Sequence, residues 1–254
     1  MKKFAGVLLS IVMLFTVSAC GSKINDDALD AFEEAIINLT KIESTDFIVE
    51  VKQSSGEADA TINIDGTFIN KNKNPQAMIR MNSELTNENS DSAISMYLDQ
   101  GSIYVNFANI VKQKKAVDLS LITSASSATI KKGTLKTSGI KKQLKSAKLK
   151  DGNITLEFDT KTLKDVMKET IEKDSSGIMS GYKDFEFEKL DLEMNVNDGI
   201  MEKVIVKMNM KLEDQKADIT FTLSFKNMNK AKDITFPDFS EYVESSSTNP
   251  LLGL

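Results

Sequence analysis

The sequence predicts an α+β protein in which a curved antiparallel β-sheet folds over an N-terminal helix and one or two internal helices. Eight or nine segments alternate apolar with polar residues, which is typical of strands that have one buried and one solvated face. The first segment after the leader instead repeats apolar residues at helical spacing. The regular strand–helix alternation of parallel α/β folds is absent, which argues against two-lobed solute-binding and nucleotide-binding folds.

The first 19 residues have the layout of a signal peptide, and the residue that follows is a cysteine. Two lysines precede Phe4–Val17, a run of fourteen uncharged residues that is shorter than the roughly 18–20 apolar residues of a spanning helix. The tetrapeptide Val17–Cys20 looks like a bacterial lipobox. We therefore expect Cys20 to become the first mature residue, modified with diacylglycerol and palmitate. The alternative is a secreted protein with a free, reactive thiol.

Composition excludes several classes of function. Loss of the two leader lysines lowers the net charge from −5 to −7, which argues against a nucleic-acid partner. The chain contains no histidine, which removes Ser-His-Asp and Cys-His catalysis and His-ligated metals. No EF-hand loop, phosphate-binding loop or zinc-type cysteine pair is present. We predict no catalytic residue, no metal and no cofactor.

The predicted mature chain has three parts. Residues 20–25 are the lipidated cysteine and a short polar tether, residues 26–244 form the folded domain, and residues 245–254 form a disordered tail. Asn25 is the expected N-cap of a helix over Asp26–Ile42, because the two aspartates after it suit the positive end of the helix dipole. The apolar stripe of this helix comprises Leu29, Phe32, Ile36 and Leu39.

An antiparallel meander of five strands is expected next, because the apolar period changes from helical spacing to two. Asp65-Gly66 is interpreted as a turn or bulge, and Gln100-Gly101 as a turn. The strands centre on Phe47–Val51, Ala60–Ile64, Ala77–Met81, Ile94–Leu98 and Ile103–Val105.

Residues 108–150 are predicted to form helices and loops, with one helix over Ser138–Lys148. Residues 131–150 hold eight lysines and no acidic residue. These lysines either face anionic lipid head groups, where each contributes about 1 kcal/mol, or form a solvated protein face. The two interpretations stay open.

The remaining residues predict one short strand, one helix and three long strands. Ile154–Phe158 has the strand period, and Thr160 is expected to cap a helix over Lys161–Lys173. The long strands cover residues 185–225, and Asn197–Gly199 is expected to form the hairpin turn between the first two.

A hydrophobic cavity between the sheet and the helices is the candidate binding site. Methionine is flexible and fits irregular apolar shapes, so a face lined by methionine and phenylalanine suits acyl chains. An ordinary packed core has the same composition and is the alternative. The candidate cavity-lining residues are Phe32, Ile36, Met81, Met96, Met167, Met194, Met208, Met210, Phe221 and Phe225.

The order of elements resembles the LolA/LolB-like lipoprotein-carrier superfamily, which includes the LppX/LprG-like mycobacterial lipoproteins. The resemblance covers roughly residues 26–242 and depends on the opening helix, the meander with Tyr97-Leu98 and Ile103-Tyr104, the internal helices, the three late strands and the closing Phe236-Pro237. The chain is also similar to uncharacterised Gram-positive lipoproteins. The resemblance implies an open half-barrel that shelters a hydrophobic cavity.

The leading hypothesis is a non-enzymatic lipoprotein that binds a lipid or another amphiphile. It would be anchored through Cys20 to the extracytoplasmic face of the cell membrane, with lipid cargo and other envelope proteins as partners. The alternative is a structural or protein-docking envelope lipoprotein without a small ligand. An enzyme is a third hypothesis, and the absence of histidine argues against it.

Overall fold

The computed structural model describes residues 23–55, 59–71, 74–83, 94–117, 140–162, 165, 185–212 and 215–245 of the chain. The predictions for Cys20, for the residues 118–139, for most of the helix at 161–173 and for the last nine residues lie outside this part. The chain divides into two compact units. Unit 1 comprises Met1–Ile37, Lys52–Asp59 and Ile130–Phe221, and unit 2 comprises Asn38–Val51, Ala60–Thr129 and Thr222–Leu254.

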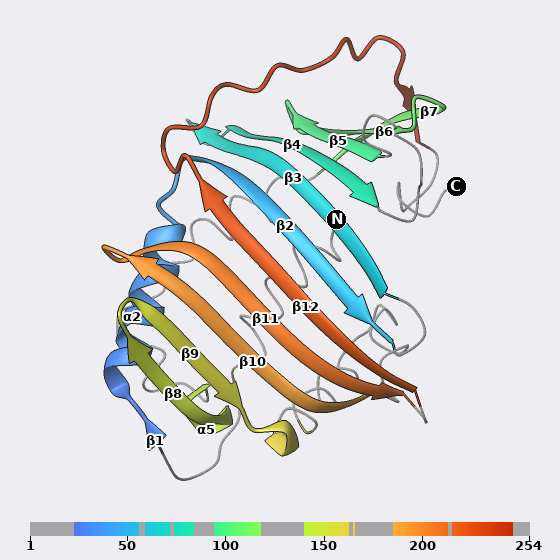
Figure 1. The fold of residues 1–254 in the computed structure, drawn as a ribbon. Helices are drawn as coiled ribbons and strands as arrows, with labels where there is room; N and C mark the ends of the chain where they lie inside the picture. Colours follow the sequence, from blue (N-terminus) through green and yellow to red (C-terminus); the bar gives the residue numbers. More distant parts are fainter. Residues whose placement is uncertain are drawn as a thin grey trace. The chain divides into compact units, whose positions relative to one another are not determined.

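Unit 1 combines helices with antiparallel strands, in the order β1-β8-β9-β10-β11-β12 (Figure 1). Strands β8 to β11 pair antiparallel, whereas β1 is parallel to β8. The elements are β1 (Lys23–Ile24), α2 (Asp26–Leu39), α5 (Ile140–Gln143), β8 (Leu144–Lys150), β9 (Asn153–Phe158), β10 (Phe185–Asn197), β11 (Ile200–Leu212) and the first part of β12 (Gln215–Lys226).

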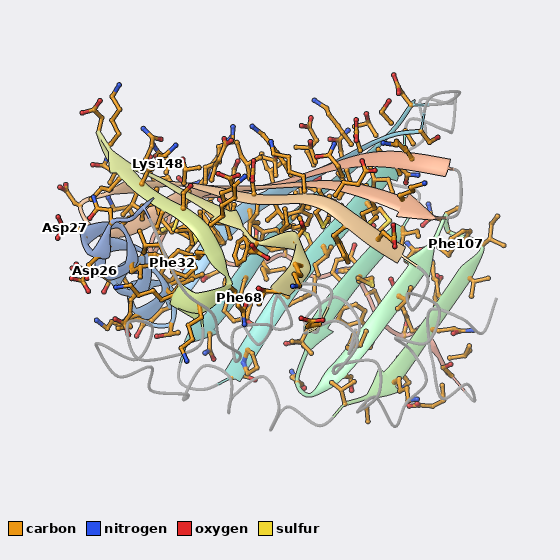
Figure 2. All side chains as sticks on the ribbon, turned by 90° about the horizontal axis from the view of Figure 1, so that it is seen from below. Asp26, Asp27, Phe32, Phe68, Phe107 and Lys148 are labelled. Atoms are coloured by element: carbon orange, nitrogen blue, oxygen red, sulfur yellow. The ribbon has the colours of Figure 1, made fainter. Side chains whose placement is uncertain are left out.

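The predicted N-cap of α2 is confirmed. The Asn25 side-chain oxygen accepts a hydrogen bond from the Asp27 N–H at 2.8 Å, which satisfies one of the unpaired donors of the first turn. Asp26 and Asp27 lie on the outer side of the helix, whereas Phe32 lies on the side that faces the strands (Figure 2). Leu29 and Phe32 are buried. The helix therefore covers an apolar surface, as its periodicity predicts.

The predicted end of this helix at Ile42 is wrong, because α2 ends at Leu39. The Lys41 N–H bonds to the Asn38 carbonyl and the Ile42 N–H to the Leu39 carbonyl, so the chain leaves the helix through tighter turns. Strand β2 (Ser44–Ser54) follows and carries residues of both units.

The core of unit 1 lies on the face of β8, β9 and β10 that α2 covers (Figures 1 and 2). The register places Leu192 beside Leu156, and Leu156 beside Ala147, so these side chains share one face. Ile154 and Leu156 are fully buried. Lys148 lies on the opposite side of the sheet (Figure 2).

The sequence predicts a helix over Ser138–Lys148 in the lysine-rich segment, and this prediction is wrong beyond Gln143. Leu144–Lys150 is strand β8, and it forms a hairpin with β9 through Asp151 and Gly152. Both turn residues have positive φ, 48° and 74°, the conformation that the tight hairpin requires. The turn and the pairing with β9 therefore override the helical spacing of the apolar residues. Lys23 and Ile24, at the predicted tether, form β1 beside Ser146 and Ala147.

Unit 2 is built on the predicted meander, in the order β2-β3-β4-β5-β6-β7-β13. Strands β3 to β7 pair antiparallel, and β13 is parallel to β7. The strands other than β2 are β3 (Asp59–Lys71), β4 (Asn74–Ser83), β5 (Ile94–Asp99), β6 (Ser102–Phe107), β7 (Val111–Ala116) and β13 (Val243–Glu244).

Two local predictions in unit 2 are wrong. Asp65-Gly66 is not a turn but lies inside β3. A Cβ atom at Gly66 would stand 2.4 Å from the Met78 carbonyl oxygen and 2.5 Å from the Phe47 ring, so glycine is needed for close approach of the neighbouring strands. Val111–Ala116, predicted as helix or loop, is strand β7. Its three lysines are typical of a strand near the edge of a sheet.

Residues 227–245, here named the strap, follow β12 and return across the strands of unit 2 to β7 (Figure 1). The strap ends in β13, where the Ser245 N–H donates to the Lys114 carbonyl at 2.9 Å. Within the described ranges of the chain, no helix is both long and apolar enough to cross a membrane.

Candidate functional site

In unit 1 the predicted cavity residues fall on one face of β10 and β11. Val204 pairs with Met194, and Met208 pairs with Leu190 two steps further along the same face. Met194 is 2% exposed, whereas Met208 and Met210 are half-buried. Phe221 on β12 is also half-buried. The face therefore passes from a closed core to a surface that solvent partly reaches.

In unit 2 the two predicted methionines share one face of β4 and β5. Met81 pairs with Ile94, and Met96 pairs with Ile79, so all four side chains project to the same side. These four side chains are half-buried. Phe225 near the end of β12 is half-buried as well. Unit 2 thus carries its own partly accessible apolar surface.

The remaining predicted cavity residues come from two segments that the sequence predicts as helices. Phe32 on α2 is 3% exposed and belongs to the core of unit 1, and Ile36 is half-buried. Met167 lies outside the described residues. The structure therefore groups the methionines within each unit and places Phe32 in the packed part of the molecule.

Sequence reasoning did not name several residues that share the methionine face of unit 2. Phe68 pairs with Ala77, and Phe107 pairs with Ile94, which places both aromatic rings on that face. Both side chains are half-buried. The same period-two alternation of apolar residues that places Met81 and Met96 on this face could also have identified Phe68 and Phe107. The apolar surface is consequently wider than the predicted set.

The opposite face of the same strands carries an aromatic cluster that the strap completes. Tyr104 stacks on Phe239, with ring centroids 3.7 Å apart and planes at 8°. Tyr97 meets the edge of Phe239 at 5.7 Å, and Tyr242 meets the ring of Tyr104 at 5.6 Å. Stacked and edge-to-face pairs each add roughly 0.5–1.5 kcal/mol beyond area burial. Phe236 on the strap also contacts Tyr97 and Phe239. Strand alternation does not reveal this cluster, because three of its five rings come from an irregular segment.

Charged groups also attach the strap to β7. Lys112 forms an ion pair with Glu241, and Lys114 lies 3.5 Å from a carboxylate oxygen of Glu244. Burial raises the pKa of the Tyr242 hydroxyl above its ordinary value. A hydrogen bond from the Ser240 backbone N–H lowers the pKa of Asp238, and the Ser240 hydroxyl adds to this effect.

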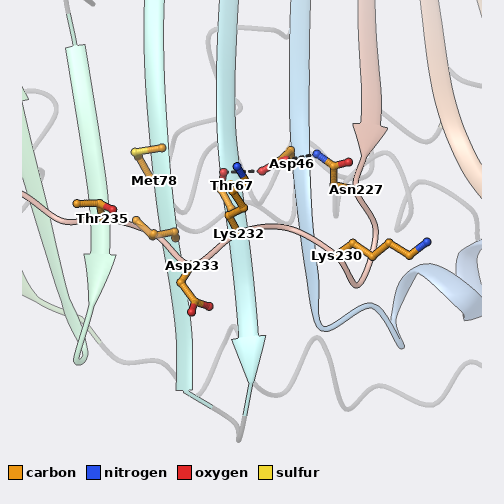
Figure 3. A pocket seen from close by; sticks show the side chains of 9 residues that line it. Asp46, Thr67, Met78, Asn227, Lys230, Lys232, Asp233 and Thr235 are labelled. Atoms are coloured by element: carbon orange, nitrogen blue, oxygen red, sulfur yellow. Dashed lines mark hydrogen bonds between the residues drawn. The ribbon is translucent and has the colours of Figure 1, made fainter.

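A pocket of about 590 Å³ lies where the strap leaves β12 and passes strands β2, β3 and β4 (Figure 3). Its volume is within the range of roughly 300–1,000 Å³ that small-molecule sites occupy. Seven of its nine lining residues are polar or charged, unlike those of the methionine faces. The lining residues are Asp46, Thr67, Met78, Asn227, Lys230, Lys232, Asp233, Ile234 and Thr235.

No arrangement typical of a metal centre occurs in the described part of the chain, where no three Cys, Asp or Glu residues gather. The carboxylates of Glu157 and Asp238 both have lowered pKa values. Lowered values describe groups that stay ionised, whereas a general acid at neutral pH needs a raised one. Neither group therefore has the raised pKa that a general acid at neutral pH needs.

The chain matches the model of a protein family described as a family of unknown function (DUF6612) over residues 27–240. Among curated proteins, none matches this sequence. Similar solved structures include LprF from Mycobacterium bovis, with a TM-score of 0.38 and 11% identity over 85% of this chain and 99% of that one.

Two further solved structures show comparable similarity. A DUF1329 family protein from Desulfovibrio piger has a TM-score of 0.33 and 6% identity over 82% of this chain and 94% of its own. The lipoprotein LppX from Mycobacterium tuberculosis has a TM-score of 0.32 and 8% identity over 83% of this chain and 100% of its own.

Proposed function

The chain belongs to the family of unknown function DUF6612, and on that premise we propose that it is a non-enzymatic lipoprotein that binds a lipid or another amphiphile. The observation that carries the proposal is the accessibility of the methionine faces. Met81 and Met96 in unit 2, and Met208 and Met210 in unit 1, share faces with other apolar side chains and remain half-buried.

A contiguous apolar surface that folding leaves partly open is typical of a ligand or partner site. Methionine adapts its three side-chain torsions to the shape in contact with it, so a methionine-lined surface accepts flexible acyl chains. The resemblance to lipoprotein carriers supports the same occupant. In this proposal acyl chains lie against the partly accessible methionine face of each unit.

The anchor is proposed to be the acylated thiol of Cys20, at the extracytoplasmic face of the cell membrane. The first strand begins at Lys23, three residues after this cysteine. Three residues extend at most about 11 Å, so β1 would be held close to the lipid head groups. Lys148 and Lys150, exposed on the adjacent strand β8, suit contact with anionic head groups.

Native mass spectrometry of the mature protein, purified gently from a bacterial membrane, tests the binding function. We expect an additional mass that organic extraction removes and that matches a phospholipid or glycolipid. The acyl groups on Cys20 are covalent and survive extraction, so they serve as an internal control. A protein that stays free of ligand after incubation with lipid vesicles would contradict the proposal and favour protein docking.

The anchor has an independent test in Cys20→Ala. We expect this variant to lack acylation and to leave the membrane fraction, because no other thiol is available in the chain. Ser22→Ala, a substitution two residues away, is the control and should stay acylated and in the membrane fraction. The anchor would be contradicted if the Cys20→Ala protein were still acylated, or if the membrane fraction retained it as fully as it retains Ser22→Ala.

A further inference from the structure

The pocket beneath the strap contains a carboxylate that is held in place without being neutralised. The Thr67 hydroxyl donates to Asp46 Oδ1 at 2.7 Å, and the Asn227 amide donates to Asp46 Oδ2 at 2.7 Å (Figure 3). Both donors are uncharged, and no described lysine or arginine pairs with Asp46. Each carboxylate oxygen of Asp46 therefore has a fixed position and a further lone pair that can accept a hydrogen bond.

The turn that supplies Asn227 is tied firmly to the start of β2. The Asn229 N–H donates to the Ser44 carbonyl at 2.6 Å, and the Asn229 side-chain oxygen accepts from the Glu43 N–H at 2.8 Å. Asn227 and Asn229 both have positive φ, 53° and 57°, a conformation that asparagine adopts more readily than most residues. The wall of the pocket is therefore pre-formed around Asp46.

Two lysines on the strap supply positive charge to the same pocket. Lys230 and Lys232 are exposed, and neither forms an ion pair with a described residue. With Asp46 and Asp233, they give a lining whose formal charges sum to zero while both signs are present. Met78 and Ile234 add apolar contact between the charged groups.

We propose that this pocket binds a small zwitterion that carries a primary ammonium and a phosphate or carboxylate. The ammonium would donate to Asp46, and the anionic group would pair with Lys232 through a charge-assisted hydrogen bond. The exposed Lys230 side chain points away from Asp46 in Figure 3 and would turn toward the anionic group when the ligand binds. An anion alone would be opposed by Asp46, and a cation alone by the two lysines. A ligand with both charges on a short linker satisfies the whole lining. Phosphoethanolamine represents this chemistry, either free or as a lipid head group.

The site is separate from the methionine faces. Thr67 and Met78 pair directly across β3 and β4, and they alternate with Gly66 and Ile79, which lie on the methionine face. Ligand at the pocket therefore does not require lipid on the opposite face. The two proposals can fail independently.

Isothermal titration of the full chain in non-ionic detergent tests the proposal with three probes. We expect phosphoethanolamine to bind at least tenfold more tightly than either ethanolamine or inorganic phosphate. Equal affinity for phosphoethanolamine and phosphate, or no binding of phosphoethanolamine, would overturn it. Dihexanoyl phosphatidylethanolamine distinguishes the source. Tighter binding than phosphoethanolamine assigns a lipid head group, and weaker binding assigns a free zwitterion.

Asp46→Asn tests the role of the fixed carboxylate. The Asn227 amide can turn over to accept from the new side-chain amide, so we expect the fold to survive. Affinity for phosphoethanolamine should fall at least tenfold, and affinity for phosphate should not fall. Asp238→Asn, an exposed strap aspartate outside the pocket, is the matched control and should bind as the wild type does.

The double variant Lys230→Gln/Lys232→Gln tests the proposal independently, in case the Asp46→Asn protein does not fold. Both lysines are exposed, so their replacement should leave the melting temperature unchanged while phosphoethanolamine affinity falls at least tenfold. Lys203→Gln, an exposed lysine on β11, is the control. Wild-type affinity in the double variant would overturn the proposal.

Discussion

Two parts of one apolar face in unit 1 differ in how completely they are buried. On β9 and β10, Ile154 and Leu156 are fully buried and Met194 is 2% exposed. On β11, Met208 and Met210 belong to the same face by register but remain half-buried. Period-two alternation produces both parts. The difference is therefore tertiary, and it separates side chains that stabilise the fold from side chains that are available for contact.

The energetic consequence follows from the burial. A fully buried aliphatic side chain contributes roughly 1.5–3 kcal/mol relative to an exposed one, whereas a half-buried side chain contributes part of this amount. The apolar area that stays accessible around Met208 and Met210 can still be covered by a ligand. The same reasoning applies within unit 2, where Met81 and Met96 are half-buried but Leu98 and Val105 are buried.

The largest effect is expected for Leu156→Ala. This side chain is fully buried, so its truncation removes apolar contacts and leaves a cavity, at a cost of about 2–5 kcal/mol in the free energy of unfolding. Urea unfolding followed by far-ultraviolet circular dichroism measures the change. Ile200→Ala, at a residue that is 44% exposed, is the control and should change stability by less than about 1 kcal/mol. Similar values for the two variants would contradict the burial of β9.

A matched pair of methionines tests the contrast directly. Met194→Gln places an amide in a closed core, which should cost at least about 2 kcal/mol because the amide loses its hydrogen bonds to water. Met208→Gln, on the same face, should cost less than about 1 kcal/mol and should reduce the lipid recovered with the protein. Urea unfolding and native mass spectrometry supply the two measurements. Equal losses of stability would mean that the surface around Met208 is as closed as the surface around Met194.

Local signals predicted much of this architecture. Asn25 is predictable as an N-cap from its residue type and the two aspartates that follow it, and its side chain accepts a hydrogen bond from the Asp27 N–H. Asn197–Gly199 is predictable as a hairpin turn, and Asp198 and Gly199 have the positive φ of such a turn. The role of Gly66 depends on Phe47 and Met78 rather than on its sequence neighbours, so the sequence does not reveal it. The helical spacing around Leu144 likewise fails, because pairing with β9 decides the structure there. Caps and tight turns are therefore predictable from adjacent residues, whereas features set by packing and strand pairing are not.

The candidate sites show the same division. Period-two alternation predicts which methionines share a face. The difference in burial between Met194 and Met208 depends on tertiary packing, which alternation does not show. The pocket at Asp46 could not be predicted, because Asn227 bonds to it across 181 residues of chain. The aromatic cluster likewise joins Tyr104 to Phe239 without any periodic signal.

The smallest effect concerns the charged face of the same strands, opposite the core. A hydrogen bond from Lys145, whose Nζ lies 2.7 Å from Glu157 Oε1, is the main cause that lowers the pKa of Glu157. The folded pKa therefore lies below the unfolded value of about 4.3. The resulting stabilisation is fully present above that pH and is lost as pH falls through the folded pKa.

Replacement of Glu157 by glutamine should accordingly cost less than about 1 kcal/mol at pH 7, because the pair is partly exposed to solvent. The difference from the wild type should shrink as pH falls below about 4, where the wild-type carboxylate becomes protonated. Urea unfolding at a series of pH values measures this difference. Glu34→Gln, at an exposed residue of α2, is the control. If the difference in unfolding free energy between the two proteins widens on acidification, Lys145 does not stabilise the ionised carboxylate. The polar face would then contribute to stability through packing alone.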